Sequence, residues 1–212
     1  FMATSCCPAW SMMAKKLFPE RANCISMAMT PMVLTARMIK QANPDDRICF
    51  IGPCAAKKLE ASRRSVRSDV AFVPIVEELA GMSEGKEVAF SALEASDDLQ
   101  YGTADGRGFA VGGGVAQAVV NYIKDKYPDR EVKVASAQGL ADCKKMLMLA
   151  KAGKYNGYLL EGMACPGGCI AGAGTLADPA RTATLLTKYK KDAPIQHSAD
   201  SDFKDYGKLL HD

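Results

Sequence analysis

Short apolar runs and stretches of helical periodicity alternate along most of the 212-residue chain. Apolar runs bounded by turn residues predict strands at 47–52, 69–73, 131–135 and 158–160. Apolar residues at helical spacing predict helices at 11–18, 32–41, 74–82, 115–126 and 140–152. Because strands and helices alternate, we predict an α/β fold with a largely parallel or mixed sheet and a site at the strand ends.

Two parts of the chain lack this alternation. The acidic and polar stretch 83–107 has little pattern, so we predict a surface connection there. After Gly174 the chain becomes more polar, with helical pieces around 179–191 and 202–210. We therefore expect 1–174 to form the main body and 175–212 to form a helical C-terminal extension of the same domain.

Composition narrows the possible functions. Hydrophobic residues make up 48% of the chain and charged residues 24%, an ordinary globular mixture. Aromatic residues are only 7% and the net charge is a dispersed +3, which favours neither a nucleic-acid groove nor a membrane-binding helix. No apolar run approaches the length of a membrane span, and no basic and apolar leader opens the chain. We therefore expect a cytoplasmic protein without a membrane span or a nucleic-acid partner.

The cysteines carry the candidate chemistry. Several of them lie beside glycine or proline, and in an intracellular chain that context favours metal binding over disulfides. The eight cysteines are Cys6, Cys7, Cys24, Cys49, Cys54, Cys143, Cys165 and Cys169. Histidine offers little alternative, since His197 and His211 both fall in the polar tail.

The stretch 161–174 is the strongest metal-site signal. Cys165 and Cys169 stand four residues apart among glycines, directly after an apolar run. Thiolates are soft ligands suited to iron-sulfur clusters and to zinc, and glycine lets the backbone come close to an inorganic body. The residues alone leave zinc and a simple iron-sulfur cluster both open.

Two further segments place cysteines at the start of a predicted helix or the end of a predicted strand. Neighbouring side chains diverge, so Cys6 and Cys7 are expected to have different roles, unless both are simply buried apolar thiols. Cys54 follows the predicted strand 47–52, where open α/β sheets bind ligands. Lys57 then either neutralises an anion beside Cys54 or lies on a solvated helix face.

Three glycines, 112–114, begin the predicted helix that ends near Lys126. The exposed N–H groups at a helix start attract an anionic group, because the helix dipole and the donor geometry act together. A merely flexible helix start is the alternative.

Taken together, the segments 4–10, 52–60 and 161–169 resemble the three signatures of the iron-only (FeFe) hydrogenases. The resemblance implies an H-cluster, a [4Fe-4S] cubane joined to a two-iron centre that carries CO, cyanide and an azadithiolate bridge. Four residues match its ligands: Cys7, Cys54, Cys165 and Cys169, the last of which joins the two parts.

The resemblance also implies roles for residues around the cluster. Cys6 matches the cysteine that passes protons, Ser26 falls on the proton path, and Lys57 matches the lysine that holds a cyanide. The matching cofactor-binding positions are Pro53, Phe109, Ala110, Gly112 and Met163. The remaining thiols, Cys24, Cys49 and Cys143, are expected to be structural.

The implied activity is reversible H2 oxidation and proton reduction, with electrons exchanged with ferredoxin or a similar carrier through the cubane. Two departures, Gly52 in place of methionine and Met32 in place of glutamine, resemble hydrogen-sensing members with slow turnover. A third possibility is an iron-sulfur assembly factor that holds only a cubane. The family's earlier lobe and accessory iron-sulfur domains would lie upstream of Phe1, so we expect the isolated chain to be inactive and free of iron.

Overall fold

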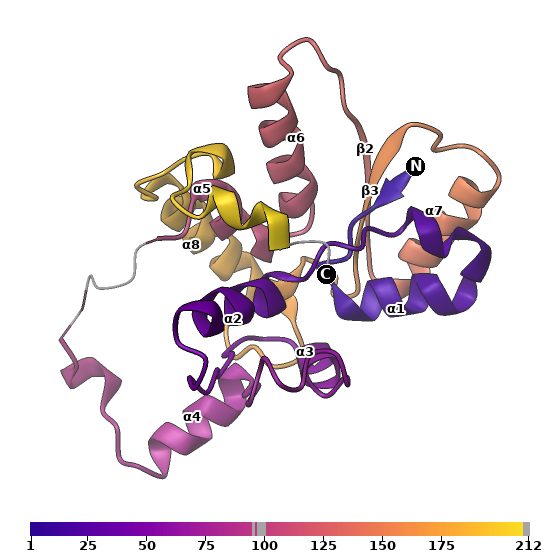
Figure 1. Ribbon diagram of the computed structural model, residues 1–212. Helices are drawn as coiled ribbons and strands as arrows, with labels where there is room; N and C mark the ends of the chain where they lie inside the picture. The colour runs from indigo at the N-terminus through magenta and orange to yellow at the C-terminus, as the bar shows by residue number, and fades with distance from the viewer. Residues whose placement is uncertain (95, 97–100, 210–212) are drawn as a thin grey trace.

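The computed structural model describes residues 1–94, 96 and 101–209, and its centre is a small parallel sheet (Figure 1). The strands are β1 (Met2–Ala3), β2 (Lys133–Gln138) and β3 (Tyr158–Met163), in the order β1-β3-β2. All pairings are parallel, and β2 runs beside β3 from Lys133 opposite Tyr158 to Gln138 opposite Met163. The predicted α/β class is confirmed, while the two-residue β1 was not predicted.

The part of the chain that the structure describes contains eight α-helices. They are α1 (Pro8–Leu17), α2 (Pro31–Ala42), α3 (Ala55–Ala61), α4 (Val76–Glu84), α5 (Ala104–Arg107), α6 (Gly114–Lys126), α7 (Leu140–Lys151) and α8 (Pro179–Lys191). Of these helices, α1, α6 and α7 pack against the sheet. Three of them, α1, α2 and α8, begin with proline, whose fixed φ suits the first helical position. Short 3-10 helices are η1 (Pro19–Cys24), η2 (Phe90–Ala92), η3 (Gly108–Ala110), η4 (Cys169–Ala171), η5 (Ser198–Asp200) and η6 (Lys204–Leu209).

The predicted strands 47–52 and 69–73 are wrong as strands. The two segments meet only through isolated parallel bridges, Cys49 with Phe72 and Gly52 with Ile75. Cys49 and Phe72 are exposed, so the first segment is not buried as expected. Two short segments without a third partner gain too few ladder hydrogen bonds to form a regular sheet.

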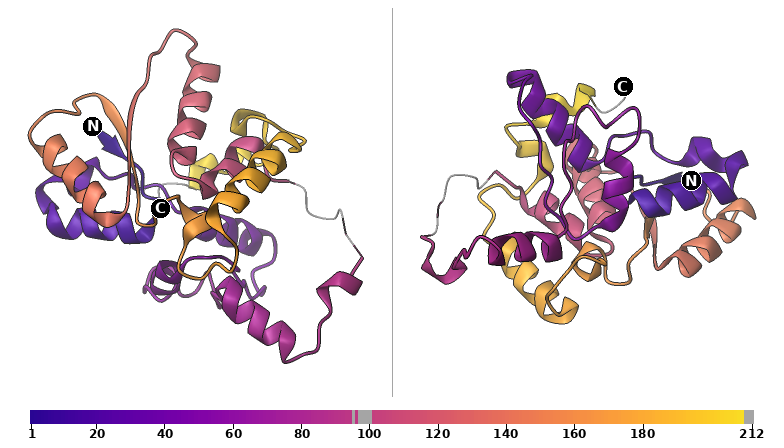
Figure 2. Two further views of the ribbon diagram at one scale, coloured as in Figure 1. Left: turned by 180° about the vertical axis from the view of Figure 1, so that it is seen from behind. Right: turned by 90° about the horizontal axis from the view of Figure 1, so that it is seen from below.

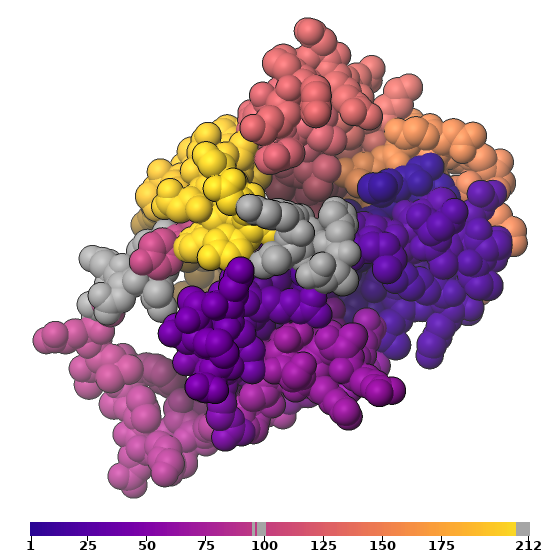
Figure 3. All heavy atoms as spheres, viewed as in Figure 1, coloured from indigo at the N-terminus to yellow at the C-terminus, as the bar shows by residue number. Residues whose placement is uncertain are grey.

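Smaller differences concern the less patterned regions. The predicted connection 83–107 contains two short helices, η2 and α5. The helix predicted at 202–210 is the 3-10 helix η6, and Leu210 and His211 lie outside the described residues. Figures 1 and 3 show α4 and the chain after it projecting from the rest of the molecule.

Two apolar cores hold the body together. One joins α1, α7 and the sheet through Ala3, Trp10, Ala14, Phe18, Ile25, Cys143, Met146, Leu147, Ala150 and Leu160. The other joins α2 to the segment after α3 through Met32, Val33, Ala36, Ala61, Val66 and Val70. In Figure 2, α1 and α7 lie at one end of the molecule, while α8 packs against α5.

Trp10 shows how closely the first core is packed. Its indole is fully buried, and Nε1 donates a hydrogen bond to the Thr4 carbonyl at 3.0 Å. The indole also lies against Gly162 in β3, where an added Cβ would overlap the ring. Only glycine at this position lets α1 approach the central strand.

We therefore predict that Gly162→Ala lowers the free energy of unfolding by about 1–3 kcal/mol, the usual cost of overpacking a core. Urea denaturation followed by tryptophan fluorescence measures the change. The matched control is Gly81→Ala in α4, where no atom beyond the backbone of the helix itself lies within 4 Å of the new Cβ. The control should be neutral or slightly stabilising, and an equal loss in both variants would contradict the packing argument.

Candidate metal centre

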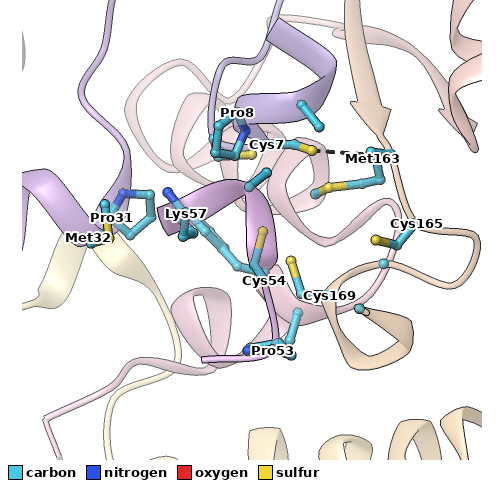
Figure 4. A pocket seen from close by; sticks show the side chains of 18 of the residues that line it. Cys7, Pro8, Pro31, Met32, Pro53, Cys54, Lys57, Met163, Cys165 and Cys169 are labelled. Carbon is cyan, nitrogen blue, oxygen red and sulfur yellow. Dashed lines mark hydrogen bonds between the residues drawn. The ribbon is translucent and has the colours of Figure 1, made fainter. Parts of the chain in front are cut away.

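A cavity of about 310 Å³ opens between the two cores, and mostly apolar residues line it (Figure 4). The lining comes from the starts of α1, α2 and α3, from η3, and from the turn between β3 and η4. Five thiols reach it: Cys6 and the four predicted ligands Cys7, Cys54, Cys165 and Cys169. The structure thus gathers side chains that span more than 160 positions of sequence around one space.

Each of the four predicted ligands stands at the junction of two elements. Cys7 is the N-cap residue of α1 and Cys54 that of α3, both with extended backbone. Cys165 follows the end of β3 by two residues, and Cys169 begins η4. Junction residues project from the end of an element, so their side chains can point into a space that the elements enclose.

Glycine makes the turn between Cys165 and Cys169 possible. Gly167 and Gly168 have φ of 95° and 92°, a region that residues with a Cβ rarely adopt. A Cβ on Gly168 would also lie 2.6 Å from the Gly112 nitrogen and 2.7 Å from the Ala110 oxygen. The turn is therefore pressed against η3, which forms the opposite wall.

The donor set fits a cluster better than a single ion. Among the described residues, no three Cys, His, Asp or Glu side chains converge closely enough to hold one metal ion. The four sulfurs instead face a shared volume, as Figure 4 shows. The Ala164 N–H donates to Cys7 Sγ at 3.5 Å, a contact of the kind that tunes cluster sulfur. Iron-sulfur binding fits these residues.

Cys6 also lines the cavity, beside Cys7 but with different surroundings. Burial, together with the nearby Glu161 carboxylate, raises the pKa of the Cys6 thiol to about 12. Burial likewise raises the pKa of Cys169 to about 11 and raises that of Cys165. Since thiolates are the metal-binding form, metal binding at Cys165 and Cys169 would release protons.

Lys57 does not lie on a solvated helix face, the alternative that the sequence left open. It lines the cavity and is only 8% exposed. Its Nζ lies 2.7 Å from Glu60 Oε2, and the Thr30 hydroxyl donates to the same oxygen at 3.2 Å. Glu60 and Thr30 were missed in the sequence, although the spacing of three between Lys57 and Glu60 is typical of a helical ion pair.

The glycine run at the start of α6 does bind an anion, and that anion belongs to the chain itself. Glu161 Oε1 accepts from the Gly113 N–H at 2.7 Å, and Oε2 accepts from the Ala116 N–H at 2.6 Å. Glu161 is fully buried, and this burial raises its pKa. A carboxylate in a strand beside glycines was the available signal, but the long separation in sequence concealed the partner.

The other predicted site residues divide into two groups. Pro53, Phe109, Ala110 and Met163 line the cavity. Ser26 and Gly112 are not among the residues that line the cavity. The Ser26 hydroxyl instead accepts a hydrogen bond from the Ala28 N–H at 3.1 Å. The Gly112 N–H donates to the Gly167 carbonyl at 3.3 Å, which places Gly112 behind the cysteine turn.

The three remaining thiols, Cys24, Cys49 and Cys143, do not line the cavity either. Cys143 is fully buried beneath the sheet, where Sγ lies 3.5 Å from the Met163 carbonyl, and burial raises its pKa to about 11.

Comparison with known proteins decides the family. The family described as "Iron only hydrogenase large subunit, C-terminal domain" matches residues 1–173. The chain belongs to this family. Among solved structures, an apo form of [FeFe]-hydrogenase HydA1 from Chlamydomonas reinhardtii aligns with a TM-score of 0.74 at 18% identity, covering 98% of this chain and 70% of that one. A structure reported as showing stepwise [FeFe]-hydrogenase H-cluster assembly aligns with a TM-score of 0.72 at 20% identity, over 96% of this chain and 70% of that one. At these identities the structures show a shared fold.

Curated relatives include both hydrogenases and assembly proteins. Iron hydrogenase 1 of Clostridium pasteurianum is 29% identical over 82% of this chain and 37% of its own length. The periplasmic [Fe] hydrogenase large subunit of Nitratidesulfovibrio vulgaris is 29% identical over 81% of this chain and 50% of its own length. Cytosolic iron-sulfur assembly component 3 of Bos taurus is 28% identical over 83% of this chain and 47% of its own length. The chain therefore spans half or less of these relatives.

One relative is periplasmic by name, so the cytoplasmic location stays a prediction. Within the described residues, no helix is both long and apolar enough to cross a membrane.

The burial of the thiols predicts their order of alkylation in the metal-free protein. Exposed Cys49 should react with iodoacetamide first at pH 7.5, whereas Cys6 and Cys169 react slowly because their raised pKa leaves little thiolate. Their rates should rise as the pH increases, and Cys143 should stay protected until the protein unfolds. Peptide mass spectrometry measures each rate. Equal labelling of all eight thiols at pH 7.5 would contradict the cavity geometry.

The buried pair of Lys57 and Glu60 predicts a second result. Glu60→Ala should lower the free energy of unfolding by about 3 kcal/mol, because it leaves the Lys57 ammonium without its counter-charge in an apolar wall. Lys57→Met combined with Glu60→Leu should lose less, since both charges are then gone. Asp142→Ala removes an exposed ion pair with Lys145 and serves as the control with a much smaller loss. Equal losses in Glu60→Ala and the control would exclude a role for burial.

Proposed function

We propose that this chain holds an H-cluster and serves in reversible H2 oxidation and proton reduction. The observation that carries the proposal is the placement of four thiols and one buried lysine around a single apolar cavity. A cubane alone needs the thiols but has no use for a buried ammonium, whereas a cyanide ligand is an anion that Lys57 can bind. Within the family, this arrangement therefore favours a hydrogenase over a cubane-only assembly factor.

The residues that line the cavity would have three roles: binding the cluster, orienting an anionic ligand and excluding water. Cys7, Cys54, Cys165 and Cys169 hold the cluster, and the cluster supplies the redox chemistry and the site of hydrogen activation. The Lys57 ammonium orients an anionic ligand from one side. The apolar side chains of Phe109 and Met163 exclude water, which strengthens the interactions inside the cavity.

Cys6 would hold and pass the proton at its Sγ. It lines the cavity but precedes the ligand Cys7, so its thiol remains free for proton transfer. Ser26 would act further out, since its hydroxyl is half-buried and is hydrogen-bonded to backbone rather than lining the cavity. We propose ferredoxin or a similar carrier as the electron partner, H2 and protons as substrates, and the cytoplasm as the location.

A hydrogen-sensing role with slow turnover is the second candidate, and one observation favours it. A Cβ on Gly52 would lie 2.7 Å from the Phe50 ring, and that ring lines the cavity. Phe50 thus occupies the space that a methionine at position 52 would need. Met32, also in the lining, places a second apolar side chain where the catalytic members carry an amide.

The domain division belongs to the same proposal. Residues 1–174 would be the later portion of the cluster domain, and 175–212 a helical extension of it. The contacts of α8 with α5, η3 and η4 support this, because those elements include or adjoin the cavity wall. The earlier lobe and accessory iron-sulfur domains of the longer relatives would complete the site.

Infrared spectroscopy of the protein matured together with the earlier lobe tests this proposal. Bands of bound CO and cyanide are expected, together with hydrogen turnover driven by a reduced viologen dye. Cys6→Ala should keep the bands and lower turnover at least 100-fold, the typical contribution of a positioned proton donor. Cys49→Ala, an exposed thiol outside the cavity, is the matched control and should be unchanged.

The three candidate functions give different outcomes. Bands with very slow turnover in the unmodified protein would support the sensor. A cubane without CO or cyanide bands would leave the assembly role. Undiminished turnover in Cys6→Ala would contradict the assignment of the proton donor.

A further inference from the structure

One buried thiol has no role in the proposed mechanism: Cys143, near the start of α7. Its side chain is fully buried in the apolar core that joins α1, α7 and the sheet. The other buried residues of α7, a helix that the structure describes from end to end, are Met146, Leu147 and Ala150. None of these three side chains can donate a hydrogen bond, so Cys143 is the one buried side chain of this helix that can.

The Cys143 thiol lies against two backbone carbonyls at the end of the sheet. Its Sγ is 3.4 Å from the Ala137 oxygen in β2 and 3.5 Å from the Met163 oxygen in β3. Each is a contact between an S–H donor and a carbonyl acceptor, which is weak when taken alone. Burial raises the pKa of Cys143 to about 11, so the thiol keeps its proton at neutral pH and remains a donor.

The Met163 carbonyl belongs to a peptide unit whose other end contacts a predicted cluster ligand. The Ala164 N–H, on the same peptide bond, donates to Cys7 Sγ at 3.5 Å. The carbonyl also accepts from the Gly139 N–H at 2.8 Å, so two donors meet its oxygen. One peptide plane thus joins the start of α7 on one side to the Cys7 thiol on the other.

A peptide unit transmits polarisation from its carbonyl to its N–H. Donors at the carbonyl oxygen draw electron density through the amide and strengthen the N–H as a donor, by roughly 10–30% per bond. A stronger N–H···S bond stabilises the more negative, reduced form of an iron-sulfur cluster and so raises its reduction potential. A thiol outside the cavity can thereby influence a cluster inside it.

The junction between β2 and α7 also holds the chain beyond Ala164. Gln138, at the end of β2, accepts a hydrogen bond at its Oε1 from the Gly167 N–H at 2.6 Å, within the turn between Cys165 and Cys169. The junction therefore holds the segment 163–167 near both of its ends. This keeps the peptide between Met163 and Ala164 in place against Cys7.

We infer that Cys143 is a positioning residue that raises the reduction potential of the cluster by donating a hydrogen bond to the Met163 carbonyl. The inference rests on one part of the proposed function, the binding of a cubane by Cys7 and the other three thiols. It applies equally to a hydrogenase, a hydrogen sensor and an assembly factor, because each of these would carry the cubane.

A redox titration followed by electron paramagnetic resonance tests the inference in the protein produced together with the earlier lobe but without accessory iron-sulfur domains. Reconstitution with iron and sulfide alone loads the cubane without the two-iron centre, so a single cluster is titrated. In Cys143→Ala, the ratio of reduced to oxidised cubane at the midpoint potential of the unmodified protein should fall at least twofold. A twofold fall corresponds to a midpoint about 18 mV lower, from 59 mV per tenfold change for one electron.

Leu147→Val is the matched control for the lost volume. Leu147 is 2% exposed in the same core and lies one helical turn after Cys143, and the change removes one methylene without removing a hydrogen bond. Its midpoint should equal that of the unmodified protein. Cys143→Ser keeps a donor at the same position, so its midpoint should stay at or above the unmodified value.

Three results would overturn the inference. The first is an unchanged midpoint in Cys143→Ala. The second is an equal lowering in Leu147→Val, since lost packing would then explain both shifts. The third is a lowering in Cys143→Ser as large as in Cys143→Ala, because the hydrogen bond would then not be the cause.

These outcomes are distinct from failure of the proposed function. Absence of CO and cyanide bands in the matured protein would contradict the hydrogenase proposal, while the cubane titration would still decide the role of Cys143. A protein that takes up no cubane would contradict both. An unchanged midpoint in Cys143→Ala would contradict only the inference about Cys143.

Discussion

The buried carboxylate of Glu161 joins the central strand β3 to the start of α6, and the two residues after it make two more such connections. Glu161 accepts from the Gly113 and Ala116 N–H groups. Gly162 lies against the Trp10 indole of α1, and the Met163 carbonyl contacts Cys143 of α7. Three successive residues thus place three helices immediately before the chain turns into Cys165. Each of these three residues contacts a different helix. The cavity wall depends on this short strand, because the loss of one of these contacts would free the helix that it holds.

Close contacts at glycine also shape the cavity itself. Its walls come from segments far apart in sequence, and they approach closely because glycine stands where they meet. Gly168 lies against η3, and Gly172 lies against the Pro53 carbonyl that precedes Cys54. The Gly174 N–H also donates to that carbonyl at 3.0 Å. The cysteine turn is therefore tied on one side to the Phe109 segment and on the other to the Cys54 segment, which sets the spacing of the thiols.

A buried ion pair lies in the apolar wall of this cavity. Glu60 pairs with Lys57 and also accepts from Thr30, so one buried charge is matched by another. Such a pair contributes less to stability than to the placement of the ammonium, because burying two charges costs about as much as their attraction returns. The helix α1 begins directly after Cys7 and packs in the apolar core that it shares with α7, so it joins the thiol wall to that core.

Local patterns in the sequence were enough to predict the helices with clear periodicity, such as α2, α7 and α8, and an α/β fold with a largely parallel or mixed sheet. They also predicted that Cys6 and Cys7 differ in role, because adjacent side chains diverge. They failed for 47–52 and 69–73, whose apolar composition resembles a strand although no third segment completes a sheet.

Only the tertiary structure decided which residues meet. It showed that the anion at the glycine run is Glu161, that Lys57 is buried against Glu60, and that Ser26 and Gly112 lie away from the cavity lining. The reason is physical: propensity and periodicity act between neighbours, whereas burial, charge pairing and cavity shape depend on contacts between distant segments.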